Sequence, residues 1–378
     1  AEGHAVRALY LYCAMADVAA ATGDEALLRQ TIKLWEDITQ HQMYVTGGVG
    51  QSGTLERFTV PDDLPNDANY AETCANIALA LFSLRLGRIT GEARYHDIAE
   101  LELYNAIASG ISRDGTSFFY VNPMEIWPDN CLEASSRGHV KPTRQAWFSC
   151  ACCPPNLART YASLGQYLLS VDDDEVFIQQ YVGFTTELEL GGSTVTLSLS
   201  GDYAIEGKVT LTAKASQPVK LALRQPGWCR DWNQGAPASD GYLHLTLPAG
   251  SNSLDLDFRP EAQFLAARPE VRADRGLAAL RRGPLIFAAE SVDNGPNLAA
   301  LRVAVAAPPP TLAVDTESRL PCLIAEGVRE ELPDWPADQL YRSLAEQSII
   351  ETACRIKYVP YAFWGNRGAG EMRVWLRY

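Results

Sequence analysis

The sequence predicts a multidomain protein of mixed α and β structure, in which a partial helical toroid is followed by C-terminal β-sandwich domains. Apolar residues recur at helical spacing through the first 170 residues, whereas segments after Asp172 alternate between apolar and polar residues. The expected helices form hairpin-like pairs that do not close a domain, so most hairpins of such a toroid would lie before residue 1. We therefore expect a toroid part, a sandwich and a second sandwich-like domain over residues 1–172, 173–260 and 261–378.

Five helices are expected in the first part. Leu27, Trp35 and Ile38 exemplify the helical spacing, and proline is favoured at the first helical position, so Pro154 or Pro155 is expected to open the last helix. A long irregular stretch, 111–153, separates the last two helices, and long loops inside compact domains are usually functional. The expected helices span about 4–21, 25–42, 74–86, 95–109 and 156–170.

Five segments after Asp172 have the period-two alternation of half-buried strands, with turn residues between them. A second β-rich section then runs to the end of the chain. It is interrupted by Pro308-Pro309-Pro310 and by a polar insert near 329–349, for which we expect some helix. The five alternating segments span 194–199, 208–212, 219–223, 243–247 and 254–258.

Composition excludes several classes of partner. A net charge of −14 argues against binding to nucleic acid or to an anionic membrane surface. No run of 18 or more apolar residues is present, so we expect no transmembrane helix. Nine cysteines, two of them adjacent, predict reduced thiols rather than a disulfide framework, which favours a reducing bacterial cytoplasm. Because the chain begins at Ala1 within a helical pattern, we expect the natural N-terminus, with any export signal, to lie upstream.

A cysteine cluster before Pro154 is the strongest chemical signal. Cys150, Cys152 and Cys153 lie within four positions at an expected helix start, where the dipole favours thiolates. With Glu72 and Cys74 they supply enough ligands for tetrahedral zinc, although spacing alone does not identify which cysteines bind. Residues two apart on a regular helix point about 200° apart, so Glu72 and Cys74 share a metal only if a helix begins there. The alternative is a capping glutamate and a buried cysteine.

Four further polar residues are candidates on weaker grounds. Glu56 follows the Gly47-Gly48-Val49-Gly50 turn, which lacks the strand-and-helix setting of a phosphate-binding loop. Taken alone, Glu56 is more typical of a solvated loop carboxylate. His4, Glu100 and Tyr120 are also more typical, one by one, of structural residues.

Several short motifs follow one another along essentially the whole chain in a characteristic order and spacing. They are Gly3-His4-Ala5-Val6-Arg7, Tyr44-Val45-Thr46-Gly47-Gly48, Glu56-Arg57-Phe58, Leu64-Pro65-Asn66, Tyr70-Ala71-Glu72-Thr73-Cys74-Ala75, Leu103-Tyr104-Asn105, Phe119-Tyr120-Val121-Asn122-Pro123, Cys152-Cys153-Pro154-Pro155-Asn156, Arg282-Gly283-Pro284-Leu285, Val359-Pro360-Tyr361, Trp364 and Asn366-Arg367-Gly368. In this order and spacing the chain resembles glycoside hydrolase family 127. The resemblance implies a zinc-dependent β-L-arabinofuranosidase with an (α/α)6 barrel and C-terminal β-sandwiches, of which this chain is the C-terminal part.

The resemblance also implies a role for each candidate. Cys152 would be the nucleophile of a retaining mechanism, and Glu56 the general acid/base, although Thr54 and Leu55 before it depart slightly from the family's pattern. The zinc ligands would be Glu72, Cys74, Cys152 and Cys153, and the sugar-binding positions would be His4, Glu100 and Tyr120.

The expected partner is a small carbohydrate, an L-arabinofuranoside or a related furanoside, and a homodimer is conceivable. A different class of function is a structural zinc site in a carbohydrate-binding protein without hydrolase activity. Sugar epimerases share helical toroids, but they generally use histidine bases rather than a thiolate cluster. Because the family's N-terminal half is absent, we expect the 378-residue chain alone to be poorly active.

Overall fold

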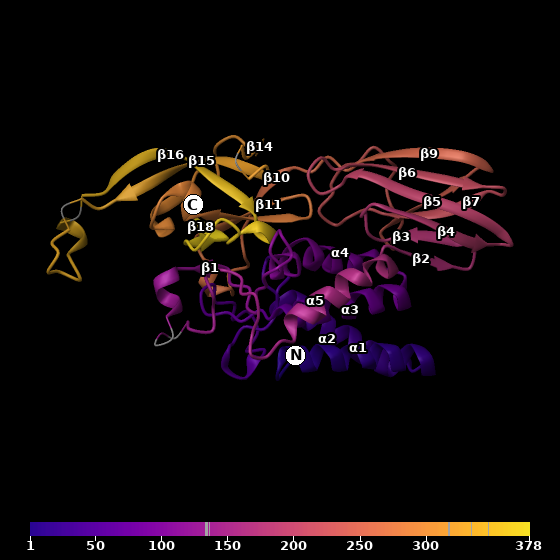
Figure 1. The fold of residues 1–378 in the computed structure, drawn as a ribbon, viewed down its shortest axis with the longest axis horizontal. Coiled ribbons are helices and arrows are strands. Elements are labelled where there is room, and N and C mark those ends of the chain that lie inside the picture. The colour runs from indigo at the N-terminus through magenta and orange to yellow at the C-terminus, as the bar shows by residue number, and fades with distance from the viewer. Residues whose placement is uncertain (133–134, 136, 317, 334, 347) are drawn as a thin grey trace.

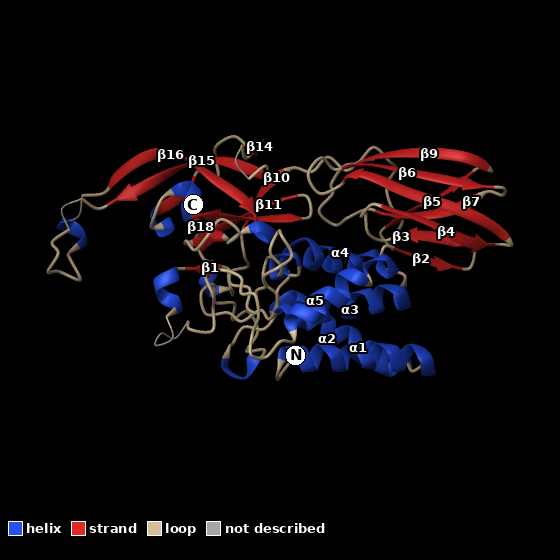
Figure 2. Cartoon of the chain, viewed as in Figure 1, coloured by secondary structure: helices blue, strands red, loops and turns tan. Residues whose placement is uncertain are grey.

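The computed structural model describes residues 1–132, 135, 137–316, 318–333, 335–346 and 348–378. A layer of helices lies along one side of the molecule, and two β-rich regions lie side by side against it (Figures 1 and 2). The chain runs through the helices first, then through the β-region next to α4 (Ala93–Leu101), and ends in the β-region next to β1 (Glu125–Ile126). The arrangement agrees with the predicted order of a helical part before β-rich parts.

Local sequence signals set the ends of the first helices. Gly23 ends the first helix at a positive φ of 68°, a conformation that glycine adopts without strain. The Asp24 side chain then accepts a hydrogen bond from the Leu27 amide, 2.9 Å away, and caps the second helix. The five α-helices of this part are α1 (Ala5–Thr22), α2 (Glu25–His41), α3 (Thr73–Thr90), α4 (Ala93–Leu101) and α5 (Cys153–Ala162).

Helix α3 is the buried centre of the helical layer. Leu79 and Phe82 of α3 share a core with Leu9 and Ala16 of α1. Among the described residues, α1 alone has the length and apolar composition of a membrane span, a property that core helices also have. Its packing against α3 accounts for the buried part of its apolar surface.

Two predicted helices differ from those observed. The helix expected over 95–109 continues from α4 through a π-helical turn, Glu102–Ala106, and a 3-10 turn, Ala108–Gly110. The helix expected to reach Ser170 ends at Ala162, and strand β2 (Leu169–Asp172) begins soon after it. Strand β2 forms a tight hairpin with β3 (Glu175–Ile178), and β3 pairs in turn with the distant strand β7 (Val219–Arg224), a pairing that the local apolar spacing does not show.

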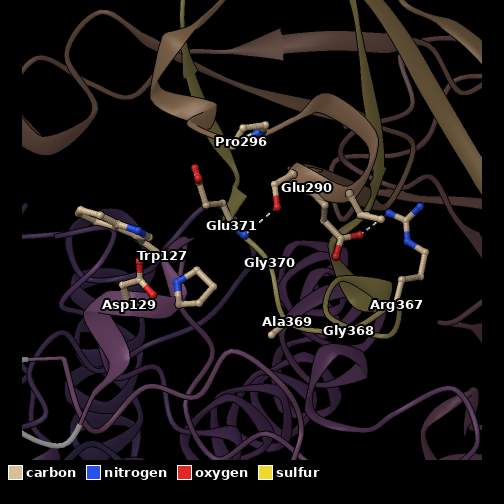
Figure 3. Close-up of a pocket in the computed structure, with 12 residues that line it drawn as sticks. Trp127, Asp129, Glu290, Pro296, Arg367, Gly368, Ala369, Gly370 and Glu371 are labelled. Carbon is tan, nitrogen blue, oxygen red and sulfur yellow. Dashed lines mark hydrogen bonds and ion pairs between the residues drawn. The ribbon is translucent and has the colours of Figure 1, made fainter.

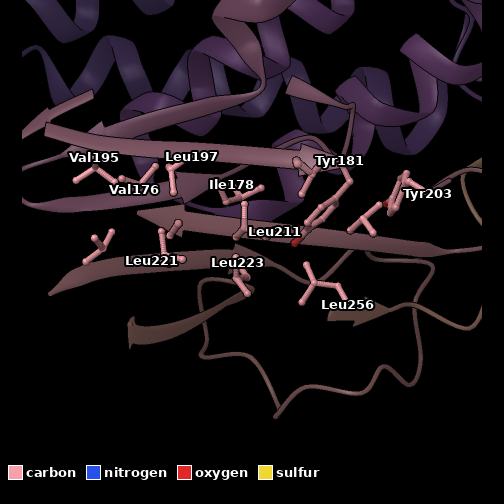
Figure 4. Packing of buried hydrophobic residues seen from close by; sticks show 14 of the residues in the cluster. Val176, Ile178, Tyr181, Val195, Leu197, Tyr203, Leu211, Leu221, Leu223 and Leu256 are labelled. Carbon is pink, nitrogen blue, oxygen red and sulfur yellow. The ribbon is translucent and has the colours of Figure 1, made fainter. Parts of the chain in front are cut away.

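The first β-rich region consists of two four-stranded sheets that share one hydrophobic core (Figure 4). The sheet orders are β2-β3-β7-β8 and β4-β5-β6-β9. Four of the five predicted alternating segments lie within these strands, and the fifth, 254–258, extends one residue beyond β9. Ile178 and Leu221 from one sheet pack against Leu197, Leu211 and Leu256 from the other. The remaining bounds are β3 (Glu175–Ile178), β4 (Phe184–Leu190), β5 (Ser193–Asp202), β6 (Lys208–Ala215), β7 (Val219–Arg224), β8 (Tyr242–Leu247) and β9 (Gly250–Asp257).

The second β-rich region is a closed sheet, which corrects the second sandwich expected over 261–378. Strands β11, β12, β16, β15, β13 and β18 pair in this order, and β18 pairs again with β11 to form a six-stranded barrel. Alternation identifies the inward face of a strand but not its neighbours, so closure was not predictable from the pattern. The bounds are β10 (Ala262–Leu265), β11 (Leu277–Arg282), β12 (Leu285–Glu290), β13 (Leu301–Val303), β14 (Thr311–Val314), β15 (Pro321–Glu331), β16 (Ile350–Pro360), β17 (Met372–Arg373) and β18 (Trp375–Arg377).

Two connections extend from this barrel. Strand β1 (Glu125–Ile126), from the long loop of the helical part, pairs with β17 and joins the loop to the barrel. Strands β15 and β16 continue beyond the barrel as a two-stranded arm, visible in Figure 1. Of the helix expected near 329–349, the described residues form one 3-10 turn, Leu344–Glu346.

Candidate metal centre and active site

The starts of helices α3 and α5 bring the cysteine cluster together. Glu72 occupies the N-cap of α3 with non-helical angles (φ −58°, ψ 134°), which satisfies the condition for Glu72 and Cys74 to face one site. Cys152 is the N-cap of α5, and Cys153 is its first residue. Both helix N-termini therefore carry cluster residues, and their dipoles favour negative charge there.

The geometry of the cluster fits a tetrahedral zinc ion. One ligand atom from each of Glu72, Cys74, Cys152 and Cys153 lies within 4.8 Å of the others. The Cys153 sulfur is 3.6 Å from that of Cys74 and 3.7 Å from that of Cys152. Zinc–sulfur bonds of about 2.3 Å at tetrahedral angles place sulfurs roughly 3.8 Å apart. The Glu72 Oε2 atom is buried without a hydrogen-bond partner among the described residues, so it has free ligand capacity.

Crowding of acidic groups strongly perturbs their protonation. Burial, followed by the neighbouring Cys152, raises the pKa of Glu72 to about 8. Burial likewise raises the pKa of Cys153, whereas hydrogen bonds with Cys152 and Cys153 lower the pKa of Cys74. Buried acids close to one another resist simultaneous ionisation unless a cation compensates their charge. The donor set therefore matches a divalent cation that accepts thiolates.

Cys152 differs from the other members of the cluster in its exposure. It is half-buried, whereas Glu72, Cys74 and Cys153 are buried. Its sulfur lies 3.3 Å from Glu72 Oε1 and 3.1 Å from the hydroxyl of Tyr120, whose ring packs on Phe148. The predicted nucleophile is thus the accessible thiol of the cluster, and predicted sugar-binding Tyr120 lies beside it.

Glu56 also lies close to Glu72 and is paired with His4. The His4 Nε2 atom is 2.8 Å from Glu56 Oε2, and the Tyr70 hydroxyl donates to Glu56 Oε1 at 2.9 Å. Ligand atoms of His4, Glu56 and Glu72 all lie within 4.8 Å of one another. Leu55 and Glu56 have positive φ angles of 60° and 51°, a strained backbone that persists when the surroundings hold it in place.

The structure does not bring Glu100 to this cluster. Glu100 is only 2% exposed, and its carboxylate pairs with the buried Arg224 guanidinium of β7. It also accepts hydrogen bonds from the Tyr203 hydroxyl at 2.7 Å and the Trp228 indole at 2.8 Å. All three partners belong to the first β-rich region, so we do not retain Glu100 as a sugar ligand.

Sequence reasoning did not identify Tyr70 as a member of the site. Tyr70 holds Glu56 and stacks obliquely against His139, with ring centroids 6.0 Å apart. Its position two residues before Glu72 was the available signal, because a helix start that presents Glu72 also fixes its neighbours. Cys150 is exposed and is not part of the cluster that the described residues form.

Comparisons with known proteins agree with the geometry. Residues 1–166 match the profile described as the catalytic domain of glycoside hydrolase family 127, β-L-arabinofuranosidase, and residues 262–377 match the family's C-terminal domain. The chain is 37% identical over 396 aligned positions to the non-reducing end β-L-arabinofuranosidase of Bifidobacterium longum subsp. longum, covering all of this chain and 59% of that protein.

Solved structures show the same relationship. A family 127 β-L-arabinofuranosidase from Geobacillus stearothermophilus T6 superposes with a TM-score of 0.92 at 41% identity, over 100% of this chain and 61% of that one. A second family 127 β-arabinofuranosidase superposes at 0.87 with 30% identity, over 100% and 60%. The chain thus spans about three-fifths of the length of these relatives. By sequence and by structure, the chain belongs to glycoside hydrolase family 127.

Proposed function

We propose that this chain carries the catalytic residues of a retaining glycoside hydrolase that releases β-L-arabinofuranose or a related furanose. The observation that carries this proposal is that a half-buried thiol, Cys152, and a hydrogen-bonded Glu56–His4 pair both lie close to one carboxylate, Glu72. A retaining mechanism needs a nucleophile and a proton donor at the anomeric centre. The relatives' activity on β-L-arabinofuranosides supports the choice of sugar.

Glu72, Cys74, Cys152 and Cys153 would hold the metal, for which zinc is the best match to three sulfurs and one carboxylate. When bound, the ion would supply the positive charge that keeps these thiols ionised near neutral pH. An ordinary cysteine thiol has a pKa near 8.5 and is mostly protonated under those conditions. The proposed nucleophile therefore has the charge state it needs.

The proposed reaction has two steps. The Cys152 thiolate attacks the anomeric carbon while the bond to the leaving oxygen breaks, and Glu56 donates its proton to that oxygen. Glu56 then removes a proton from water, whose oxygen displaces the sulfur and leaves the anomeric configuration unchanged overall. Tyr70 and His4 orient the Glu56 carboxyl group through their hydrogen bonds, and Tyr120 orients the sulfur.

The structural-zinc alternative receives less support from the site. Four protein ligands are by themselves also the set of a closed structural zinc site. Here the Cys152 side chain is accessible, and Glu56 lies within reach of the cluster. Both features favour a catalytic site over a metal site that only links two segments of the chain.

We also propose that α1–α5 form part of an (α/α)6 barrel completed by a segment that the longer relatives contain and this chain does not span. Leu11 and Val18 lie exposed on α1 and would pack against that segment. The two facing sheets would be the family's first β-sandwich. A carbohydrate substrate follows from the family, and the site would open toward the completed barrel.

Covalent labelling tests the nucleophile directly. The chain is incubated with a cyclophellitol of β-L-arabinofuranosyl configuration, and the adduct is located by intact-mass measurement and peptide mapping. We expect one adduct on Cys152, absent from Cys152→Ser and retained by Cys150→Ser, which removes an exposed thiol outside the cluster. An adduct on another residue, or hydrolysis by Cys152→Ser at the parent rate, would rule out Cys152 as nucleophile.

A further inference from the structure

A pocket of about 480 Å³ lies between the long loop of the helical part and the C-terminal barrel (Figure 3). Trp127 and Asp129, from the long loop of the helical part, line one side of the pocket. Glu290, Arg367 and the segment 368–370 form its barrel side. None of its lining residues belongs to the Cys152 cluster or to the Glu56–His4 pair. Its volume is within the range of ligand sites, about 300–1,000 Å³.

Trp127 forms the aromatic wall of this pocket and is exposed to solvent. The Trp127 side chain is 59% exposed, and its indole N–H has no partner among the described residues. The preceding strand β1 pairs with β17, with Glu125 opposite Arg373, so the backbone that carries Trp127 is held against the barrel. A fixed, exposed indole offers an apolar face together with a polar N–H group. Sugar rings, which have C–H faces and hydroxyl rims, match such a surface.

The opposite wall offers oriented hydrogen-bonding groups. The Arg367 guanidinium is held by Glu290 and by Asp293, whose Oδ1 and Oδ2 lie 3.0 and 2.6 Å from it. The Ser291 hydroxyl oxygen accepts a hydrogen bond from the Glu371 amide at 2.9 Å. The backbone amides of 368–370 make no hydrogen bond to another described residue. These amides are therefore available to a ligand, whereas the Arg367 guanidinium is already bound to its two carboxylates.

The charged side chains that line the pocket limit the classes of ligand that it could bind. Three carboxylates and one guanidinium line the pocket, a net charge of −2 (1 − 3), which repels anions. Two of the carboxylates are already engaged, which makes a cation a poor match. Glu371 accepts the amides of Asn297 at 2.7 Å and Leu298 at 2.8 Å, and Glu290 accepts the Gly365 amide at 2.8 Å. A neutral ligand rich in hydroxyl groups is favoured.

We propose that the Trp127 pocket binds a neutral oligosaccharide and is a glycan-holding site separate from the catalytic cluster. The identity of this oligosaccharide rests on the proposed function, because it would be the glycan from which the furanose is released. Binding itself does not, because it needs no reaction at Cys152. The site would retain a branched or polymeric substrate while single sugars are removed elsewhere.

Titration calorimetry of the 378-residue chain tests this proposal, with arabinotetraose, xylotetraose and galactotetraose as probes. We expect at least one probe to bind, and Trp127→Ala to weaken its Kd at least tenfold. The matched control is Trp147→Ala, which removes an indole 64% exposed outside the pocket and should change Kd less than twofold. Ala369→Phe fills the same pocket while retaining the indole, and it should also abolish binding.

The outcomes separate this proposal from the catalytic one. Cys152→Ser should retain the parent Kd for the oligosaccharide, whatever its effect on hydrolysis. Binding of no probe, or unchanged binding in both Trp127→Ala and Ala369→Phe, would overturn the glycan site. Displacement of the probe by tetramethylammonium ions at comparable affinity would also overturn it, because the pocket would then be a cation site.

Discussion

Glu100→Gln distinguishes a structural role for this carboxylate from the sugar-binding role that the family resemblance implies. Glu100 Oε2 accepts from the buried Arg224 guanidinium and from the Tyr203 hydroxyl, and Oε1 accepts from the Trp228 indole. The substitution removes the charge and can place an amide N–H₂ against two donors. Two lost hydrogen bonds to a charged group, at about 1.5–3 kcal/mol each, amount to about 3–6 kcal/mol of stability.

Urea denaturation followed by fluorescence and far-ultraviolet circular dichroism measures this loss. Glu92→Gln is the matched control at the start of the same helix, where Glu92 forms an exposed pair with Arg94. We expect the control to lose less than about 1 kcal/mol. Folded Glu100→Gln should be labelled at Cys152 by the cyclophellitol with the same concentration dependence as the parent, a readout that needs no turnover. A stable Glu100→Gln protein that needs a much higher cyclophellitol concentration for the same labelling would refute the structural assignment and restore Glu100 as a sugar ligand.

Three further predictions concern buried acids and the metal. Cys74→Ala should bind less than one zinc per chain by mass spectrometry under native conditions, whereas Cys150→Ala should match the parent; equal zinc content would exclude Cys74 as a ligand. Burial without any described hydrogen-bond partner raises the pKa of Glu102 well above its usual range, so the folded chain holds this proton more tightly than the unfolded chain. That stabilisation is complete below about pH 4.3 and is lost as pH rises through the folded-state pKa. The free energy of unfolding of Glu102→Gln should therefore rise relative to that of the parent between pH 5 and pH 9. Parallel plots of unfolding free energy against pH for the two proteins would contradict this. Gly47→Ala should destabilise the fold by about 1–3 kcal/mol, because φ is +94° and the new Cβ would lie 3.0 Å from Glu102 Cδ; unchanged urea midpoints would refute this.

The sequence alone determined most of the local elements, because their signals are local. Apolar spacing located the five helices, Gly23 and Asp24 marked a helix boundary, and alternation located five of the eight strands of the first β-rich region. The cysteines before Pro154 and the pair Glu72 and Cys74 marked a metal site, because few residue patterns supply four such ligands.

The tertiary structure decided everything that depends on which distant residues meet. Closure of the barrel required β18 to pair with β11, and no alternation pattern specifies that neighbour. Glu100 lies where α4 contacts the first β-rich region, so its partners are Arg224 and Tyr203 rather than the cluster. The Trp127 pocket exists only because β1 pairs with β17 and holds a loop of the helical part against the barrel. Local periodicity carries no information about such long-range pairings, because their free energy comes from contacts between segments far apart in the chain.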